Sequence, residues 1–436
     1  MNYSDNLQAL RKFLSIKENA KGLKHNINNK NPILPFPTRN PERAKFKDGF
    51  GGVTGEFVRI LNGNKITDEF SIEKVINQMI DKVEANEKDR PYFERLLRMF
   101  LSNDLKNMKV FHPYILQYIP LTPGKESKGE KDIAQFMRDV LLGNEYGFKY
   151  FFQKSRPDNL IAKLVLNQLN DLIASKTEKK YHPLLPYVTN VFNADILFLT
   201  KHRDYFLENI HLFLAYYYFF YITQVSLKLS QMHKGDWNHV NKVVYTLDWE
   251  STSKSREGYK LGYRNIKDIS RKILVHVNCL EHINYIFDTP QASTYPHLKN
   301  YFETLSNEQR INLIDLISDW IKEYRYHTSL DNIQLNYDYE SLILDLFNSL
   351  DEGIAEETKS RYALSIEEIG KRYFLKTRGN LGYMLNITQE FLLLLTTISV
   401  KDKRMPLKDV FIEFEKRGVF LDRHSKEAVV ELFDKI

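Results

Sequence analysis

The sequence predicts a mainly α-helical, multi-helical protein with a C-terminal helix-turn-helix or winged-helix-like module. Three observations support this fold class. Apolar residues recur at helical spacing along most of the 436 residues. Gly (18) and Pro (14) are scarce, which favours long elements over frequent turns. Strand-like alternation is confined to short pieces such as residues 243–249.

The helices follow one another along the chain with start and stop signals of their own. Capping boxes are expected at Ser306 with Gln309 and at Ser365 with Glu368, because the Ser side chain and the Gln or Glu side chain bond each other's backbone. The expected helical ranges are 71–83, 91–101, 131–142, 187–199, 204–231, 266–287, 337–350, 365–375, 381–399, 407–416 and 423–436.

Composition narrows the class of protein. Hydrophobic residues make up 43% and charged residues 27%, as in an ordinary folded chain, and the length suffices for two or three domains. The single Cys279 excludes a disulfide framework and a Cys-ligated zinc site within one chain, and it fits a reducing compartment. The chain starts with a polar, amphipathic segment rather than a secretory signal. We therefore expect a cytoplasmic protein.

Charge and composition divide the chain into residues 1–65, a basic N-terminal arm and glycine-rich loop, residues 66–360, a helical body, and residues 361–436, the C-terminal module. Residues 1–50 hold ten Lys and Arg against four acids, and the rest is balanced at 52 basic and 52 acidic residues. An arm that touches nucleic acid, a solvated linker and an arm docked on the protein's own body all fit. The cluster Gly49, Gly51, Gly52 and Gly55 predicts a loop leading into a short strand.

Residues 210–227 form the one candidate for a membrane span. Eighteen mostly apolar residues could almost cross a bilayer. The segment contains His211, Thr223 and Gln224, however, and its aromatic residues lie in the middle rather than at the edges. We therefore expect a buried central helix and no membrane partner.

The apparent nucleotide-binding and kinase motifs of the chain are incomplete. Gly124-Lys125 is followed by Glu126 and has no glycine five residues earlier, so it is not a P-loop. His202-Arg203-Asp204 with Asn209 spells a kinase catalytic loop, but the chain has no Asp-Phe-Gly motif. We predict no ATP-binding motif, no cofactor and no catalytic residue.

Two further groups of residues resemble metal sites. His276 and His282 flank Cys279 at helical spacing, but no fourth ligand is apparent, which favours a core position. Asp158 followed by Glu178 and Lys180 spells the carboxylate-plus-lysine set of a metal-dependent nuclease. This set is the enzymatic alternative for the chain.

Basic clusters carry the main functional hypothesis. Residues 254–272 hold seven bases and two acids with Tyr259 and Tyr263 interleaved, which suits phosphate neutralisation and base stacking. A second cluster lies at 371–378, and a third opens the last helix, where a recognition helix meets DNA. For the first two clusters, a solvated loop or helix face is the alternative. For the third, the alternative is a plain helical hairpin or a winged helix that binds a partner. The predicted nucleic-acid-binding residues are Lys254, Arg256, Lys260, Arg264, Lys371, Arg372, Lys376, Arg378, Arg423 and Lys426.

The C-terminal third resembles a known family. The stretches IEEIGKRYFLKTRGNLGYMLNITQEFLLLLTTI (366–398) and MPLKDVFIEFEKRGVFLDRHSKEAVVELFDKI (405–436) are similar to the DptG (DndG) family of DNA phosphorothioation-dependent restriction proteins. The most specific pieces are Arg378-Gly379-x-Leu381-Gly382 and Arg417-Gly418-Val419-x-Leu421-Asp422. These are signatures rather than catalytic motifs, so no active-site residue is carried over.

The resemblance implies an accessory subunit of a bacterial anti-phage restriction complex. Its partners would be DNA and companion ATPase and helicase-like subunits. The resulting hypothesis is a non-catalytic DNA-binding or assembly subunit. The alternatives are the metal-dependent DNA nuclease and a scaffold that binds proteins only.

Overall fold

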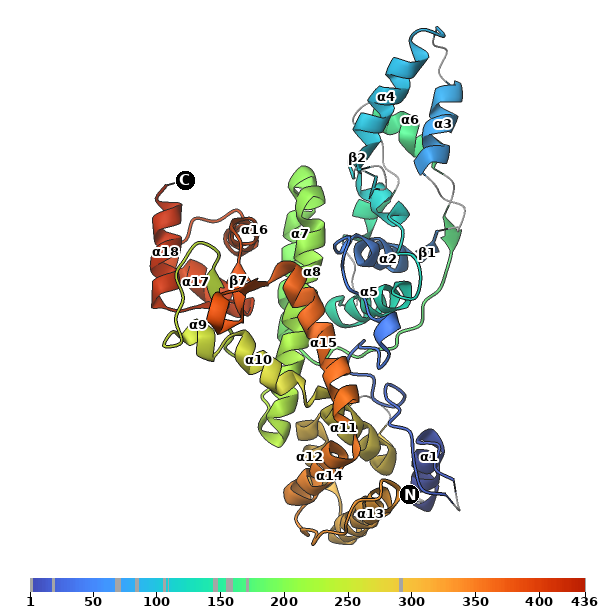
Figure 1. Cartoon of the computed structure of the whole chain (residues 1–436), viewed down its shortest axis with the longest axis vertical. Helices are drawn as coiled ribbons and strands as arrows, with labels where there is room; N and C mark the ends of the chain where they lie inside the picture. The colour runs from blue at the N-terminus through green and yellow to red at the C-terminus, as the bar shows by residue number, and fades with distance from the viewer. Residues whose placement is uncertain are drawn as a thin grey trace.

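The computed structural model of the chain describes residues 3–17, 20–66, 72–82, 86–104, 107–108, 110–143, 148–153, 160–169, 172–289 and 293–435. Within these residues, eighteen α-helices make up most of the secondary structure, and the strands are short. The predicted mainly helical class is confirmed. Three lobes surround a central pair of helices (Figure 1).

The central pair is α7 (Pro186–Leu199) and α8 (Arg203–Ser230). With 28 residues, α8 is about 42 Å long, and residues 213–229 are all buried. Its polar groups bond within the protein: His211 Nδ1 lies 2.9 Å from Thr54 Oγ1, and Gln224 donates to the Asn241 carbonyl at 2.9 Å. The prediction of a buried central helix at 210–227 is confirmed. Among the helices of the described residues, none has the length and apolar character needed to cross a bilayer.

The upper lobe in Figure 1 ends in a tip formed by three helices that share a small core of their own, separate from the main core. The helices of the upper lobe are α2 (Gly51–Asn62), α3 (Ile72–Lys82), α4 (Arg90–Leu101), α5 (Ser127–Leu141) and α6 (Leu160–Gln168). Of these, α3, α4 and α6 form the tip. Two small ladders complete the lobe, β1 (Asn64–Lys65) with β4 (Ile173–Ala174) and β2 (Ser102–Asp104) with β3 (Asn107–Met108).

The lower lobe holds the chain's N-terminal helix against a helical bundle from the middle of the sequence (Figure 1). It consists of α1 (Tyr3–Phe13), α11 (Ile273–Phe287), α12 (Tyr295–Thr304), α13 (Asn307–His327) and α14 (Tyr339–Gly353). Helix α15 (Glu356–Tyr373) packs along α8 and leads to the C-terminal lobe. That lobe contains a sheet and α9 (Glu257–Lys260), α10 (Tyr263–Ser270), α16 (Gln389–Val400), α17 (Leu407–Lys416) and α18 (Arg423–Phe433).

The sheet of the C-terminal lobe joins distant parts of the chain. β5 (Val244–Leu247) lies between β7 (Tyr383–Ile387) and β8 (Phe420–Leu421) and is parallel to both, and β6 (Leu375–Thr377) pairs antiparallel with β7. β5 confirms the strand predicted within 243–249. Residues of the C-terminal segment therefore share a sheet with the segment that carries the first basic cluster.

The N-terminal arm is docked on the protein's own body. Arg11 forms an ion pair with Glu323 at 2.7 Å, and His25 Nε2 lies 2.8 Å from the Tyr324 hydroxyl. The buried Glu281 carboxylate accepts three successive backbone N–H groups of residues 29–31, at 2.6–3.2 Å. Of the interpretations of the arm given above, the structure supports the docked one.

The predicted glycine-rich loop and following strand are wrong, because residues 51–62 form α2. Gly52 and Gly55 serve close packing within the helix, whereas Gly49, with φ +85°, lies before the helix and donates to the Phe46 carbonyl at the end of a turn. A Cβ at Gly55 would lie 2.5 Å from the Ile119 carbonyl oxygen, and one at Gly52 would lie 2.5 Å from Glu130 Oε2. Neighbouring groups approach the α2 backbone so closely that a side chain has no room.

Two other local predictions fail where tertiary contacts decide. Ser365 lies in the middle of α15 instead of capping a helix, whereas the Ser306 and Gln309 capping box is confirmed at the start of α13. The expected helix over 381–399 is a strand followed by a helix, because residues 383–387 pair with β5 and β6 before Thr388 caps α16.

Candidate nucleic-acid interface

The structure brings two of the predicted basic clusters onto one surface. Helices α9 and α10 pack against β7, and α10 also contacts α15. The Tyr263 ring meets the Tyr383 ring edge-on with centroids 6.4 Å apart, and the Tyr263 hydroxyl donates to Glu367 at 3.0 Å. The cluster at 254–272 and the cluster at 371–378 are therefore neighbours although they are distant in sequence.

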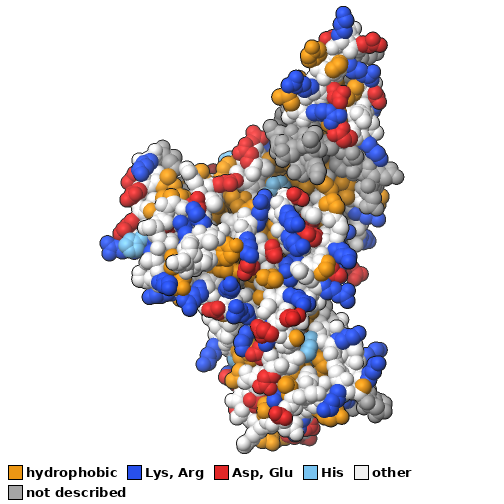
Figure 2. All heavy atoms as spheres, viewed as in Figure 1, with side chains coloured by type: hydrophobic (Ala, Val, Ile, Leu, Met, Phe, Trp, Pro, Cys, Tyr) orange, Lys and Arg blue, Asp and Glu red, His pale blue; other side chains and the backbone are white. Residues whose placement is uncertain are grey.

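Cations and aromatic rings alternate on this surface. The Arg264 guanidinium lies 5.3 Å from the centre of the Tyr259 ring and donates to its hydroxyl at 3.1 Å. The Lys371 ammonium lies 5.2 Å from the Tyr383 ring centre. Lys260 is exposed beside them on α9. We define the basic–aromatic surface as Tyr259, Lys260, Arg264, Lys267, Lys371 and Tyr383. Figure 2 shows Lys and Arg side chains gathered along the lower edge of this lobe, over α9 and α10.

The Glu367 carboxylate contacts two side chains of this region, Lys371 and Tyr263, and is ionised at neutral pH. Burial disfavours the Glu367 carboxylate, but hydrogen bonds from Lys371 and Tyr263 outweigh it, and the pKa of Glu367 lies below its ordinary value. The bond to Glu367 in turn raises the pKa of Lys371. At neutral pH both groups are charged, and Lys260, Arg264 and Lys267 add positive charge around them.

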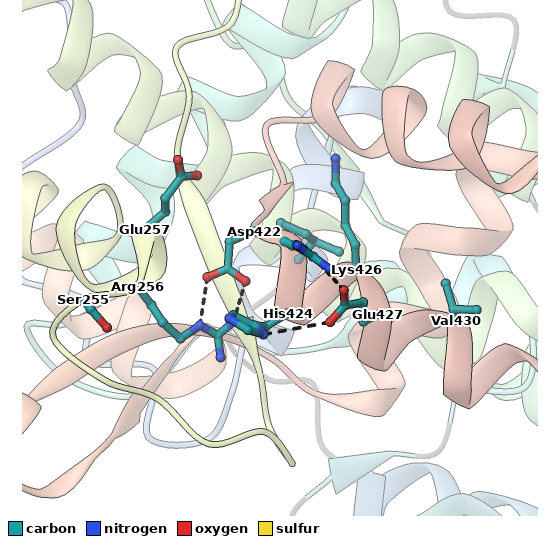
Figure 3. Close-up of a pocket in the computed structure, with 10 residues that line it drawn as sticks. Ser255, Arg256, Glu257, Asp422, His424, Lys426, Glu427 and Val430 are labelled. Carbon is teal, nitrogen blue, oxygen red and sulfur yellow. Dashed lines mark hydrogen bonds and ion pairs between the residues drawn. The ribbon is translucent and has the colours of Figure 1, made fainter.

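Arg256, also predicted to bind nucleic acid, is committed to an internal ion network. Its guanidinium donates to Asp422 at 2.5 and 2.9 Å, to Glu250 at 3.2 Å and to the Ser425 hydroxyl at 2.9 Å. The Arg256 side chain is 9% exposed. Asp422 caps α18 by accepting the Ser425 N–H at 3.0 Å. Figure 3 shows the Arg256 guanidinium directed at Asp422. This arginine holds the start of α18 to the loop before α9.

An open cavity of about 670 Å³ lies at the start of α18, and Arg256 and Asp422 of this network are among the residues that line it (Figure 3). Arg423 is 87% exposed and pairs with Glu427 at 2.9 Å, and Lys426 pairs with Glu415 at 3.3 Å. The cavity is lined by Ser255, Arg256, Glu257, Leu421, Asp422, Arg423, His424, Lys426, Glu427 and Val430. Its mixed charges suit a phosphate only where the exposed cations and the helix N-terminus face it.

Lys376 and Arg378 hold the β6–β7 hairpin in place. Lys376 Nζ donates to the Asp248 carbonyl at 2.9 Å and to its carboxylate at 2.7 Å, and this bond lowers the pKa of Asp248. Arg378 donates to the Leu247 carbonyl at 2.6 Å and to the Glu250 carbonyl at 3.2 Å. Both side chains therefore donate to backbone carbonyls of residues 247–250, at the end of β5 and in the turn that follows it.

The remaining predicted residues lie apart. Arg372 is exposed on α15, and its guanidinium lies 5.8 Å from the Tyr373 ring centre, beside Gly49. Lys254 is exposed in the loop before α9. The structure thus brings Lys260, Arg264 and Lys371 together and leaves Lys254 and Arg372 as separate exposed cations.

Within the described residues, the structure does not bring the residues of either metal-site hypothesis together as a set of metal ligands. Asp158 lies outside the described residues. The Glu178 carbonyl accepts from Gln135 at 3.0 Å, and the Lys180 N–H donates to Asp139 at 2.9 Å, so this segment is fastened along α5. Over the described ranges, no three His, Cys, Asp or Glu side chains are grouped to hold a metal ion.

Cys279 and its two flanking histidines lie on α11 and face the interior of the protein. All three side chains are buried. His276 Nδ1 lies 3.0 Å from the Tyr295 hydroxyl, and the Trp320 indole donates to His282 Nδ1 at 3.3 Å. These residues therefore hold the helices of the lower lobe together.

Sequence reasoning missed Tyr383 as a member of the surface. Interpreting 381–399 as one helix hid it, although Gly382 just before it was a signal for a break in the helix, with φ +71°. Comparisons with known proteins add no identification: no protein-family model matches the chain, and a search of the curated proteins finds no match.

Proposed function

We propose that the chain is a non-catalytic DNA-binding or assembly subunit of a bacterial phosphorothioation-dependent restriction complex that acts in the cytoplasm against phage. Its partners in this proposal are DNA and companion ATPase and helicase-like subunits. The restriction part of the proposal rests on the resemblance of residues 366–398 and 405–436 to the DptG (DndG) family. The DNA-binding part rests on the basic–aromatic surface.

The charges of that surface are available to a ligand. Lys260, Arg264 and Lys267 are exposed, and no ion pair joins them to a carboxylate of the described residues. Cations of this kind release counterions when they neutralise phosphates. Tyr259 and Tyr383 lie between the cations, where a splayed base can stack. The combination favours a nucleic-acid backbone over a small-molecule ligand.

We place the helix-turn-helix part of the proposal at α17, β8 and α18. The exposed Arg423 and His424 lie in the first turn of α18, where a recognition helix contacts DNA. The ion network of Arg256, Glu250 and Asp422 supports this assignment because it gives α18 a fixed position beside α9. Arg256, Lys376 and Arg378 then have positioning roles rather than direct contacts.

Salt-dependent binding tests the DNA-binding part. We expect a fluorescently labelled duplex to bind the full chain with an affinity that falls linearly in a plot of log affinity against log salt concentration. Each neutralised phosphate contributes about −0.9 to the slope. Absence of binding at low salt would contradict DNA binding and favour the protein-only scaffold.

The same preparation tests the nuclease alternative and the assembly part. Magnesium-dependent cleavage that is lost in Asp158→Ala would establish the nuclease. The restriction assignment predicts a stable complex when the chain is co-expressed with the ATPase and helicase-like subunits of such a system. Failure to co-purify under those conditions would contradict the assembly part.

A further inference from the structure

Helix α4 lies at the tip of the upper lobe (Figure 1) and exposes three apolar side chains to solvent. Tyr92 is 75%, Leu96 49% and Met99 73% exposed. Their spacing of four and three residues places them on one face of the helix. The opposite face is apolar too, because Leu97 is buried in the tip core. A surface helix ordinarily has one apolar face, which packs on the core. Helix α4 therefore has a second apolar face that does not contribute to the core of the tip.

A single cation lies within this second apolar face. Arg95 is exposed, three residues after Tyr92 and four before Met99. The two arginines on either side along the helix are paired: Arg90 with Asp81 at 3.1 Å, and Arg98 with Glu73 at 2.7 Å. Arg95 has no carboxylate partner among the residues that the structure describes. We call Tyr92, Arg95, Leu96 and Met99 the α4 stripe.

The geometry of the stripe suits a helix. From residue 92 to residue 99 it extends about 10 Å, or two helical turns, which is the repeat over which one amphipathic helix packs on another. Figure 2 shows hydrophobic and basic side chains side by side along the outer edge of the tip.

We propose that the α4 stripe docks an amphipathic helix of a partner protein that carries a carboxylate opposite Arg95. This inference rests on the assembly part of the proposed function and names the chemistry of the partner. A second copy of this chain fits less well, because two stripes would bring two guanidinium groups and no carboxylate to their interface. The tip lies far from the C-terminal lobe (Figure 1), so the stripe and the basic–aromatic surface are accessible at the same time.

Site-specific crosslinking tests the proposal. The natural Cys279 is buried, and burial raises the pKa of its thiol to about 12, so Met99→Cys in the full chain can be labelled selectively. The labelled protein, carrying a thiol-linked photo-crosslinker, is exposed to the soluble extract of the cells that naturally make it, and crosslinked peptides are sequenced. We expect one partner segment with apolar residues at helical spacing and an Asp or Glu among them.

A charge swap then distinguishes specific docking from non-specific hydrophobic adsorption. Arg95→Glu should lower the crosslinking yield at least tenfold, and replacing the partner's carboxylate by Lys should restore it. Leu96→Ser should also lower the yield. Ile311, which is 61% exposed on α13, is the matched control position: Ile311→Cys should give no such crosslink, and Ile311→Ser should leave the yield at residue 99 unchanged.

Several results would overturn the inference. The first two are equal crosslinking yields at positions 99 and 311, and crosslinks that form only between copies of this chain. The third is a charge swap that does not restore the crosslinking yield. The fourth is binding to phosphatidylglycerol vesicles that requires Leu96 and Met99. DNA affinity is measured on the same variants. If the crosslinking yield does not depend on the charge at residue 95 but the chain still binds DNA, only this inference is contradicted. If the charge swap behaves as expected but the chain does not bind DNA, only the DNA-binding part of the proposed function is contradicted.

Discussion

Arg417 at the end of α17 forms a buried, two-bond ion pair with Asp195 of α7, and both N···O distances are 2.7 Å. Tyr217 of α8 donates to the same carboxylate at 2.5 Å, and Lys401 approaches it at 3.0 Å. Arg417 also donates to the Ile398 carbonyl at 2.9 Å. The C-terminal lobe is therefore joined to the central helices through charges that water does not reach. Arg417, the first residue of one of the segments on which the proposed family resemblance rests, therefore has a structural role in this chain.

Removing one member of this pair should be costly. Arg417→Ala leaves the buried Asp195 carboxylate with Lys401 as its remaining cation, and we expect a loss of about 3 kcal/mol or more in the free energy of unfolding. Urea denaturation measures it. Arg423→Ala, which removes an exposed ion pair with Glu427, is the control and should change stability by less than about 1 kcal/mol. Equal losses in the two variants would contradict the role assigned to Arg417.

Gly418 should tolerate no side chain, for two separable reasons. Its φ of +80° disfavours any L-residue, and a Cβ would lie 2.2 Å from the Phe220 ring. Gly379 has a φ of +53° but nothing within 4 Å of its Cβ position. We expect Gly379→Ala to cost about 1 kcal/mol from the backbone alone, and Gly418→Ala to cost clearly more because the ring must move. Thermal unfolding compares them; similar losses would mean that the Phe220 contact is unimportant.

Local patterns predicted the elements that depend on local energetics. The range 407–416 matches α17, the strand within 243–249 is β5, and the Ser306 capping box begins α13. In each case, the signal and the structure it stabilises lie within a few residues. Helical period, alternation and side-chain capping are therefore sufficient evidence for such elements.

Predictions failed where a distant segment supplies the deciding contact. The glycines of α2 pack against Ile119 and Glu130, and no property of residues 49–55 alone indicates that approach. Arg256 reads as a free cation in a basic run, yet its partner Asp422 lies in another part of the chain. The adjacency of the clusters at 254–272 and 371–378 likewise depends on β5 pairing with β7. Such relationships follow from sheet order, which the sequence pattern does not specify.

Acid should weaken the docking of the N-terminal arm through His25. Burial lowers the pKa of His25 to about 4, against an ordinary value of 6.5. Between these values the unfolded chain takes up a proton that the folded chain does not. The stabilisation is therefore complete above pH 6.5 and is lost as the pH falls toward 4, by at most about 1.4 kcal/mol per pH unit.

Urea denaturation between pH 7.5 and 4.5 checks this expectation by comparing the native chain with His25→Gln. The variant removes the proton uptake, so the stability difference between the two proteins should shrink as the pH falls. His182→Gln, at an exposed histidine, is the control. A difference that stays constant over this range would contradict the expectation.

The basic–aromatic surface makes a quantitative prediction for DNA binding. Replacing Lys260 and Arg264 by Gln removes two exposed cations that lack a carboxylate partner in the described residues. If each neutralises one phosphate, the slope of log affinity against log salt should become shallower by about 1.8. Anisotropy titrations of a labelled duplex over a series of salt concentrations measure this slope.

Lys272→Gln is the matched control, because it belongs to the same basic run but pairs with Asp351 and lies 5.9 Å from the Phe347 ring centre. Its slope should stay within error of the native value, since an ammonium already paired within the protein releases few counterions on binding. Equal changes for Lys272→Gln and the double variant would mean that binding depends on overall charge. In that case the surface formed by α9, α10, α15 and β7 would have no special part in it.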